Sequence, residues 1–221
     1  MKRSKIPPTL FKIAVSGSAI NNCGRNAPKL SYEVGKEIAK SNCVLLSGAT
    51  TGIPLYACHG AKDFGGVSIG LSPAISKKEH VHKYHLPLEW QDMIFYTGFG
   101  YSGRNLILTR SADASIFICG RIGTLNEFTN SFEDHRVIGV LQESGGSSQL
   151  IDDIVDVAER GDKMIIYDED PARLVQKVVA TLKKGDAWFT RELAKRQKHR
   201  PVGVHAHKKA KRILQRKAQH R

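Results

Sequence analysis

One stretch of the chain, residues 104–127, combines residue types that suit phosphate binding with residue types that suit chemistry on the bound molecule. It reads RNLILTRSADASIFICGRIGTLNE, which predicts a helix carrying Arg104, a buried strand, and a glycine turn that opens a second helix. A helix N-terminus attracts phosphate through its unpaired N–H groups and its dipole, and glycine lets the backbone approach such a ligand closely. Glu127 lies one turn along, so a carboxylate and an arginine make this phosphate cradle a candidate reaction site.

The elements around this stretch alternate between short apolar strands and amphipathic helices. Strands are predicted at residues 12–16, 43–46, 67–71, 93–96, 114–118, 137–141 and 163–167. Helices are predicted at residues 26–40, 53–64, 103–111, 123–133, 149–160 and 171–184, with a loop at 72–91. Continuously apolar strands between amphipathic helices indicate a parallel sheet covered on both faces. The expected fold is therefore α/β, a doubly wound, mostly parallel, Rossmann-like sheet.

Small, glycine-bearing loops follow three of these strands, after Ser16, Leu46 and Cys119. In open parallel sheets, ligands bind outside the carboxyl ends of the strands, where the strand order reverses. We therefore predict that the three loops form one nucleotide- or phosphate-binding site. The residues expected there are Gly17, Ser18, Gly48, Thr50, Thr51, Gly52, Asn105, Gly120, Arg121, Gly123 and Thr124, with Arg104 and Glu127 as the catalytic candidates.

Composition narrows the setting of the protein. No stretch of the 221 residues approaches the length of a membrane span, and the basic start MKRSKIPPTL lacks the apolar region of a signal peptide. The four cysteines are widely spaced and form no CxxC pair. That pattern favours reduced thiols in a cytoplasmic protein over disulfides or a structural zinc.

The net charge of +13 is concentrated at the C-terminus. Residues 190–221 hold twelve Lys or Arg against Glu192, so they carry +11 and leave 13 − 11 = +2 for residues 1–189. We therefore predict a binding domain at 1–189 and a basic C-terminal arm at 190–221, with a basic amphipathic helix beyond Pro201 and Gly203. The arm suits sequence-independent binding of nucleic acid or another polyanion, or it serves only to solubilise the protein.

The glycine turn also resembles a known motif. The spacing Gly120-x-x-Gly123-Thr124-x-x-Glu127 resembles the PGGxGTxxE motif of the Lonely-guy (LOG) family, Rossmann-like proteins long described as lysine decarboxylase-like. Residues 47–52 resemble that family's second glycine loop, and residues 60–62 with 65–66 match the end of the following helix. Arg104-Asn105, followed by Ser-Ala-Asp at 111–113, is most similar to the branch that includes molybdenum cofactor carrier proteins. The resemblance covers residues 11–182.

The resemblance implies nucleotide binding and, in catalytic members, hydrolysis of the N-glycosidic bond of a nucleoside 5′-monophosphate to free base and ribose 5-phosphate. Arg104 and Glu127 match the catalytic pair. Breaking that bond develops positive charge on the ribose, which the Glu127 carboxylate would stabilise while it orients water. Alternatives are a non-catalytic carrier or sensor of a nucleotide or cofactor, and an RNA-associated binding module. The family also implies a homodimer or higher homo-oligomer; no metal and no resident cofactor are expected.

Two positions depart from the motif: Cys119 replaces its proline, and Arg121 replaces its second glycine. If position 121 requires a positive φ, arginine is strained there; otherwise its side chain stands in the cradle, where it would recognise an extra phosphate or an anionic cofactor. Cys119 beside a helix N-terminus is either a reactive thiol or a small buried filler. His80, His82 and His85 lie in the predicted loop with no matching Cys or Asp cluster, so no metal site is expected there.

Overall fold

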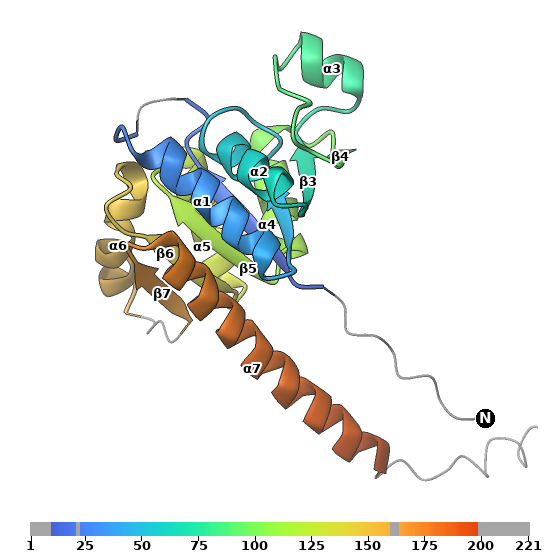
Figure 1. The fold of residues 1–221 in the computed structure, drawn as a ribbon, viewed down its shortest axis with the longest axis vertical. Coiled ribbons are helices and arrows are strands. Elements are labelled where there is room, and N and C mark those ends of the chain that lie inside the picture. The colour runs from blue at the N-terminus through green and yellow to red at the C-terminus, as the bar shows by residue number, and fades with distance from the viewer. Residues whose placement is uncertain (1–9, 21–22, 160–163, 199–221) are drawn as a thin grey trace, which may run out of the picture. The chain divides into compact units, whose positions relative to one another are not determined.

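The computed structural model describes residues 10–20, 23–159 and 164–198. Within these residues, seven strands form one all-parallel sheet in the order β4-β3-β2-β1-β5-β6-β7 (Figure 1). The strands are β1 (Lys12–Gly17), β2 (Val44–Ser47), β3 (Val67–Ser72), β4 (Met93–Tyr96), β5 (Ala114–Ile118), β6 (Val137–Leu141) and β7 (Ile165–Asp168). The predicted α/β, doubly wound architecture is confirmed.

Helices cover both faces of this sheet. They are α1 (Ala27–Lys40), α2 (Ile53–Asp63), α3 (Lys77–His82), α4 (Gly100–Ser111), α5 (Ile122–Glu133), α6 (Ile151–Ala158) and α7 (Pro171–Lys198), with a short 3-10 helix at Gly146–Leu150. Helices α1 and α2 and the first turns of α7 pack on one face, whereas α4, α5 and α6 pack on the other. The chain crosses from the first face to the second between α2 and α4 and returns to the first with α7, which makes the sheet doubly wound.

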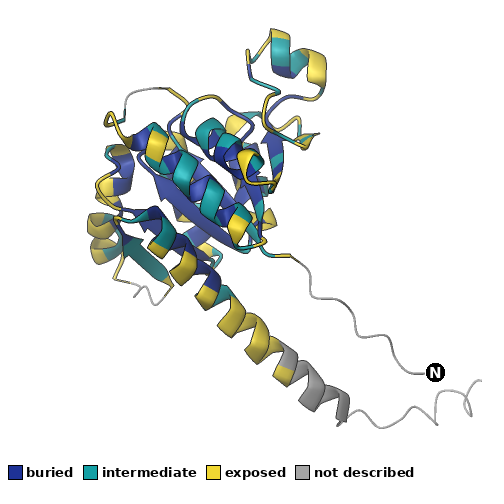
Figure 2. Cartoon of the chain, in the orientation of Figure 1, coloured by how far each residue is buried: buried dark blue, intermediate teal, exposed yellow. Residues whose placement is uncertain are grey.

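The two-sided cover explains why the strands are apolar throughout. Ile13 and Val15 of β1 point to the α1 face, while Ala14 between them points to the α4 face, and all three are buried. On the α5 face, Phe117 of β5 meets Phe128 of α5 edge-to-face, with ring centroids 5.8 Å apart. Figure 2 shows the central strands as a buried layer between helices whose outer faces are exposed, whereas the edge strands β4 and β7 are less buried. Burial on both sides is what a parallel sheet requires of its sequence.

Residues 72–91 were predicted as a loop, and this prediction is wrong, because α3 lies within them. The Ser76 hydroxyl accepts a hydrogen bond from the Glu79 N–H and caps the helix. The helix has six residues, KKEHVH, too few to show an apolar period. Its His80 is buried between the Ser72 hydroxyl and the Pro87 carbonyl, each 2.8 Å from a ring nitrogen, so it anchors the fold. The described residues contain no group of three or more potential metal ligands.

The chain divides into two compact units, residues 1–182 and 183–221. Helix α7 runs to Lys198, beyond the predicted end at Lys184. Residues 199–221, where the distal amphipathic helix of the basic arm is predicted, lie outside the described residues. Among the helices that are described, none has the length and apolar character needed to cross a membrane.

Candidate functional site

The strand order reverses between β1 and β5, which are neighbours although they are far apart in sequence. Gly17 at the end of β1 is paired with Ile118 at the end of β5, so the loops that follow leave the sheet together. A cavity of about 350 Å³ lies at this point, within the size range of small-molecule sites. The fold therefore places a ligand-sized cavity where an open parallel sheet is expected to have one.

Most of the residues predicted for the site line this cavity. They come from the end of β1 (Gly17, Ser18), the loop after β2 (Gly48, Thr50), helix α4 (Arg104, Asn105) and the start of α5 (Arg121, Gly123, Thr124, Glu127). Four segments that are distant in the sequence are thus brought together, and the first turn of α5, where N–H groups have no partner within the helix, lines the cavity.

Three predicted residues lie outside the cavity lining and shape the loops instead. The Thr51 hydroxyl donates to the Ala19 carbonyl at 2.6 Å, which ties the loop after β2 to the loop after β1. Gly52 is the N-cap of α2 and has φ +73°. Gly120 has φ +107°, a conformation that side chains rarely adopt, so glycine is required at this turn.

A buried ion pair forms part of the cavity wall. Arg104 Nη1 donates to Glu127 Oε1 at 3.0 Å, and the two side chains are only 6% and 8% exposed. The Ser16 hydroxyl donates to the other carboxylate oxygen, Oε2. The Asn105 amide lies against the same carboxylate: with its nitrogen on that side it donates to Oε1 at 2.8 Å and to the Tyr101 carbonyl at 3.0 Å. Both oxygens of Glu127 are therefore engaged by protein donors.

Gly48 makes room for this pair. A Cβ atom at position 48 would lie 2.1 Å from Arg104 Nη1, so the guanidinium rests directly on the backbone of the loop after β2. Among the described residues, Arg104 donates only to Glu127, and its buried Nε has no acceptor. The close approach explains why this loop needs glycine next to an arginine from a different helix.

Burial dominates the ionisation of both partners. Removal from water raises the pKa of Glu127 above its ordinary value, although Arg104 and Ser16 act in the opposite direction. The same loss of solvent lowers the pKa of Arg104, and Glu127 opposes that shift. A carboxylate and a guanidinium held in a buried site at a cavity are a frequent feature of functional sites.

The backbone settles how Arg121 fits the turn. Arg121 has φ −141° and ψ −157°, an extended conformation without strain, and its side chain lines the cavity. The residues with positive φ in this turn are Cys119 (+56°) and Gly120 (+107°). The sequence left open whether Arg121 is strained by a positive φ or places its side chain in the phosphate-binding turn. The structure has the second arrangement.

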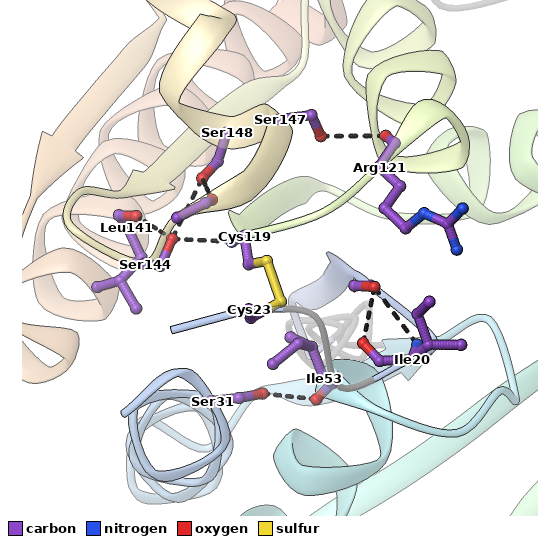
Figure 3. The surroundings of a disulfide bond; sticks show 12 residues. Ile20, Cys23, Ser31, Ile53, Cys119, Arg121, Leu141, Ser144, Ser147 and Ser148 are labelled. Atoms are coloured by element: carbon purple, nitrogen blue, oxygen red, sulfur yellow. Dashed lines mark hydrogen bonds between the residues drawn. A yellow bond between two sulfur atoms is a disulfide. The ribbon is translucent and has the colours of Figure 1, made fainter. Parts of the chain in front are cut away.

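Cys119 is joined to Cys23 by a disulfide, with Cα atoms 6.0 Å apart (Figure 3). The prediction of reduced thiols is wrong for these two cysteines, and Cys119 is neither a reactive thiol nor a simple filler. Wide spacing in sequence hid the pairing, because β1 and β5 are adjacent only in the folded sheet. Cys43 and Cys58 lie outside any disulfide and are buried. The prediction of a cytoplasmic location was based on four reduced cysteines, and two of the four form a disulfide.

Several residues at the site were not predicted. Tyr101, Ile122 and Pro54 line the cavity, and Ser16 binds the Glu127 carboxylate from the end of β1. Ser16 carried a usable signal, since it is a hydroxyl at the carboxyl end of a strand that faces the site. Tyr101 and Ile122 carried none, because apolar residues in a first helical turn ordinarily read as packing.

Comparisons with known proteins agree with this fold. A protein of Archaeoglobus fulgidus described only as uncharacterized is 28% identical over 133 residues, which are 60% of this chain and 81% of that protein. The molybdenum cofactor binding protein of Rippkaea orientalis is similar in structure, with a TM-score of 0.66 and 23% identity over 79% of this chain and 98% of its own. The molybdenum cofactor carrier protein of Chlamydomonas reinhardtii has a TM-score of 0.65 and 23% identity over 79% and 99%. At these identities the two structures show a shared fold.

The family is established by sequence. The family model described as SLOG cluster4 matches residues 10–175, which include every strand and every cavity-lining residue of the first unit. This match does not extend to the narrower LOG assignment, which stays a prediction. The chain belongs to the SLOG cluster4 family.

Proposed function

We propose that the protein binds a phosphorylated nucleotide or a nucleotide-like cofactor in the cavity at the β1–β5 reversal and acts as its carrier or sensor. One observation carries the proposal: loops from three strand ends and the first turn of α5 surround a ligand-sized cavity that contains two arginines. Family membership and the fold shared with proteins named for molybdenum cofactor binding and carriage support it.

The α5 side of the cavity suits the phosphate. Gly123 and Thr124 lie in the first turn of α5, where N–H groups and the helix dipole attract anions. The charged lining residues are Arg104, Arg121 and Glu127, which sum to +1. Arg121 adds a guanidinium that makes no ion pair with any described residue, so its donors remain for a ligand oxygen.

The rim of the cavity suits a planar ring. Tyr101 is 49% exposed and Ile122 is 80% exposed, although both are large and apolar. A heterocycle placed between them would cover apolar surface that the unliganded protein leaves in water. A ligand with a ring at one end and a phosphate at the other therefore matches the cavity in both chemistry and size.

The state of Glu127 favours binding over turnover. A carboxylate that stabilises positive charge on a ribose must be ionised and directed at the ring. Here both of its oxygens face protein donors, and burial raises its pKa. The pair Arg104–Glu127 thus reads best as a rigid wall of a binding site.

Hydrolysis of a nucleoside 5′-monophosphate is the second candidate, because Arg104 and Glu127 both line the cavity. In that reaction Glu127 would stabilise the cationic ribose and orient water, and Arg104 would hold the phosphate or the departing base. Glu127→Gln should then lower the rate of base release about a hundredfold or more while preserving nucleotide binding. If the wild-type protein releases no base from a panel of monophosphates, hydrolysis is contradicted, and the carrier or sensor function is the remaining candidate.

Titration calorimetry with nucleosides and their 5′-monophosphates tests the proposed function. Phosphate recognition predicts that each monophosphate binds at least about tenfold more tightly than its nucleoside, since charge-assisted hydrogen bonds are lost without the phosphate. Native mass spectrometry of the purified protein identifies any ligand that is retained. Equal affinities for the two forms, or no binding of either, would contradict a phosphate site.

A further inference from the structure

The disulfide Cys23–Cys119 joins two segments that both build the cavity. Ser18 and Ala19, on the chain leading to Cys23, line it, and so do Arg121 and Ile122, which follow Cys119. Figure 3 shows the bridge between the segment that carries Ile20 and the turn that carries Arg121. The two cysteines are 96 residues apart, so the bond is a covalent link between two walls of the site that are distant in the sequence.

Cys119 lies on the fixed side of this link. Its N–H donates to the Ser144 hydroxyl at 2.8 Å, and its carbonyl accepts from the Ser148 N–H at 2.9 Å. Its sulfur packs against Gly146, where a Cβ atom would lie only 2.7 Å away. Cys119 is fully buried, whereas Cys23 is only partly buried. Cys23 is therefore the half of the bridge that a reagent in solution reaches first.

We propose that this disulfide is a reversible thiol–disulfide modification site that sets the affinity of the cavity, with the oxidised protein binding its ligand more tightly. The inference rests on the proposed function for its consequence, but the existence and reversibility of the bond do not depend on any ligand. It assigns a role to Cys119, which is one of this chain's two departures from the glycine-turn motif.

A dithiol is the co-reactant that balances the reaction. One of its thiolates attacks Cys23 Sγ, the S–S bond breaks, and Cys119 leaves as a thiolate close to the N-terminus of α5. The second thiol of the reductant then resolves the mixed disulfide, which releases the Cys23 thiol and a cyclic disulfide. The protein gains two electrons and two protons, the reductant loses them, and oxidation runs the same steps in reverse.

Preorganisation gives the direction of the effect. The bond holds the loop after β1 against the glycine turn before any ligand arrives, so binding does not have to order the two walls. After reduction, hydrogen bonds such as Thr51 Oγ1 to the Ala19 carbonyl still tie the β1 loop to the β2 loop. The covalent tie to the glycine turn is the one that is lost, while the hydrogen bond from Ser16 to Glu127 remains. Affinity should therefore fall, while the fold remains.

The first measurement is independent of ligand. The full-length protein is equilibrated in mixtures of reduced and oxidised dithiothreitol, denatured, alkylated and weighed. Two alkylated thiols are expected at the oxidising end and four at the reducing end, with the same curve from both directions. Hydrogen exchange of the native protein should rise on reduction in peptides covering residues 17–20 and 119–124. Four thiols at every mixture would overturn the inference.

The second measurement uses adenosine 5′-monophosphate as the probe. Reduction of the wild type should weaken its binding about tenfold or more, and Cys23→Ser should bind weakly in both conditions. Cys58→Ala, at a buried cysteine outside the bridge, serves as the matched control and should respond like the wild type. Identical affinities in both redox states would overturn the inference, even if the bond forms.

The two proposals fail in different ways. If neither adenosine 5′-monophosphate nor any other nucleoside 5′-monophosphate binds in either state, the proposed function is contradicted, and hydrogen exchange still decides the redox inference. Increased exchange in both peptides on reduction supports it, because the bond then orders the two walls. Unchanged exchange overturns it, since the bridge would then constrain nothing at the site.

Discussion

Two carboxylate–arginine pairs in the first unit have the same chemistry and opposite settings. Glu127 meets Arg104 at 3.0 Å in the cavity wall, and Asp168 meets Arg173 at 2.9 Å where β7 leads into α7. Both carboxylate side chains are buried, but the Arg104 side chain is only 6% exposed, whereas that of Arg173 is 63% exposed. Burial raises the pKa of Glu127, while hydrogen bonds from Arg173, from Lys177 and from the Asp170 N–H hold the pKa of Asp168 well below its usual range.

The difference in solvent exposure of the arginines suggests different roles for the two pairs. Asp168–Arg173 is suited to stabilising the fold, and Glu127–Arg104 is suited to a ligand-binding site. Asp168 gains charged partners whose own side chains stay in water, so its ionisation favours folding at little cost. Glu127 and Arg104 both lose their water, and the attraction between buried charges repays that loss poorly. A buried pair is therefore weak evidence of stability. Because the Arg104–Glu127 pair lines a cavity, a role in ligand binding explains it better than a role in stability.

Removing one carboxylate from each pair should give the largest difference. Glu127→Ala leaves Arg104 as an uncompensated buried charge, which should lower the free energy of unfolding by about 3–5 kcal/mol. Asp168→Ala is the matched change in the other pair. Its loss should be much smaller, because Arg173 and Lys177 return to water.

Urea denaturation of the two variants, followed by circular dichroism, measures both losses. Glu127→Gln, which keeps the shape of the side chain, separates the lost charge from the lost packing. Equal destabilisation by Glu127→Ala and Asp168→Ala would show that burial does not distinguish the pairs.

The sheet was predictable because each apolar strand can be recognised from its own residues, without knowledge of the strands that it pairs with. The segments 93–96, 114–118 and 137–141 were predicted with the bounds that the structure gives them. The strand order was not read from the sequence, because pairing of β1 with β5 joins residues about a hundred positions apart. The position of the site followed from general behaviour of such sheets, which needs only that small polar loops end the strands.

What could not be predicted depends on contacts across the sheet. The Cys23–Cys119 bond and the hydrogen bond from Ser16 to Glu127 both join the β1 segment to the region of β5 and α5. Each pair is more than ninety residues apart and follows no sequence spacing rule. Helix α3 was missed for the opposite reason, since it is local but has too few residues to show a period.

The second prediction compares the arginines that are not buried. Arg121→Gln should weaken binding of a nucleoside 5′-monophosphate about tenfold or more, the value of one charge-assisted hydrogen bond to phosphate. Affinity for the nucleoside should not change. Arg173→Gln is the control, because that arginine donates to Asp168 and lies outside the cavity. Calorimetry with both ligands measures the effect; equal weakening by the two variants, or none by Arg121→Gln, would place the Arg121 side chain outside the ligand contacts.

The smallest effect, and the most direct comparison of the two carboxylates, is the pH dependence of stability. The raised pKa of Glu127 means that the folded protein keeps a proton that the unfolded chain has lost. Its contribution is present below the ordinary glutamate pKa and is lost as the pH rises through the raised value. The lowered pKa of Asp168 has the opposite sign: its contribution is present above the ordinary aspartate pKa and is lost as the pH falls through the lowered value.

Thermal unfolding of the wild type, Glu127→Gln and Asp168→Asn across the acidic and neutral range tests these signs. The comparison is of slopes with pH, because the absolute midpoints also contain the effect of each substitution on Arg104 or Arg173. Glu127→Gln should remove the decline in unfolding midpoint that the wild type shows as the pH rises through the raised pKa of Glu127. Asp168→Asn should instead reduce the fall in the unfolding midpoint that the wild type shows as the pH falls into the acidic range. If both variants flatten the stability curve at the same end of the pH range, Glu127 is ionised as readily as Asp168. The contrast between the pair with a buried arginine and the pair with exposed cations then disappears.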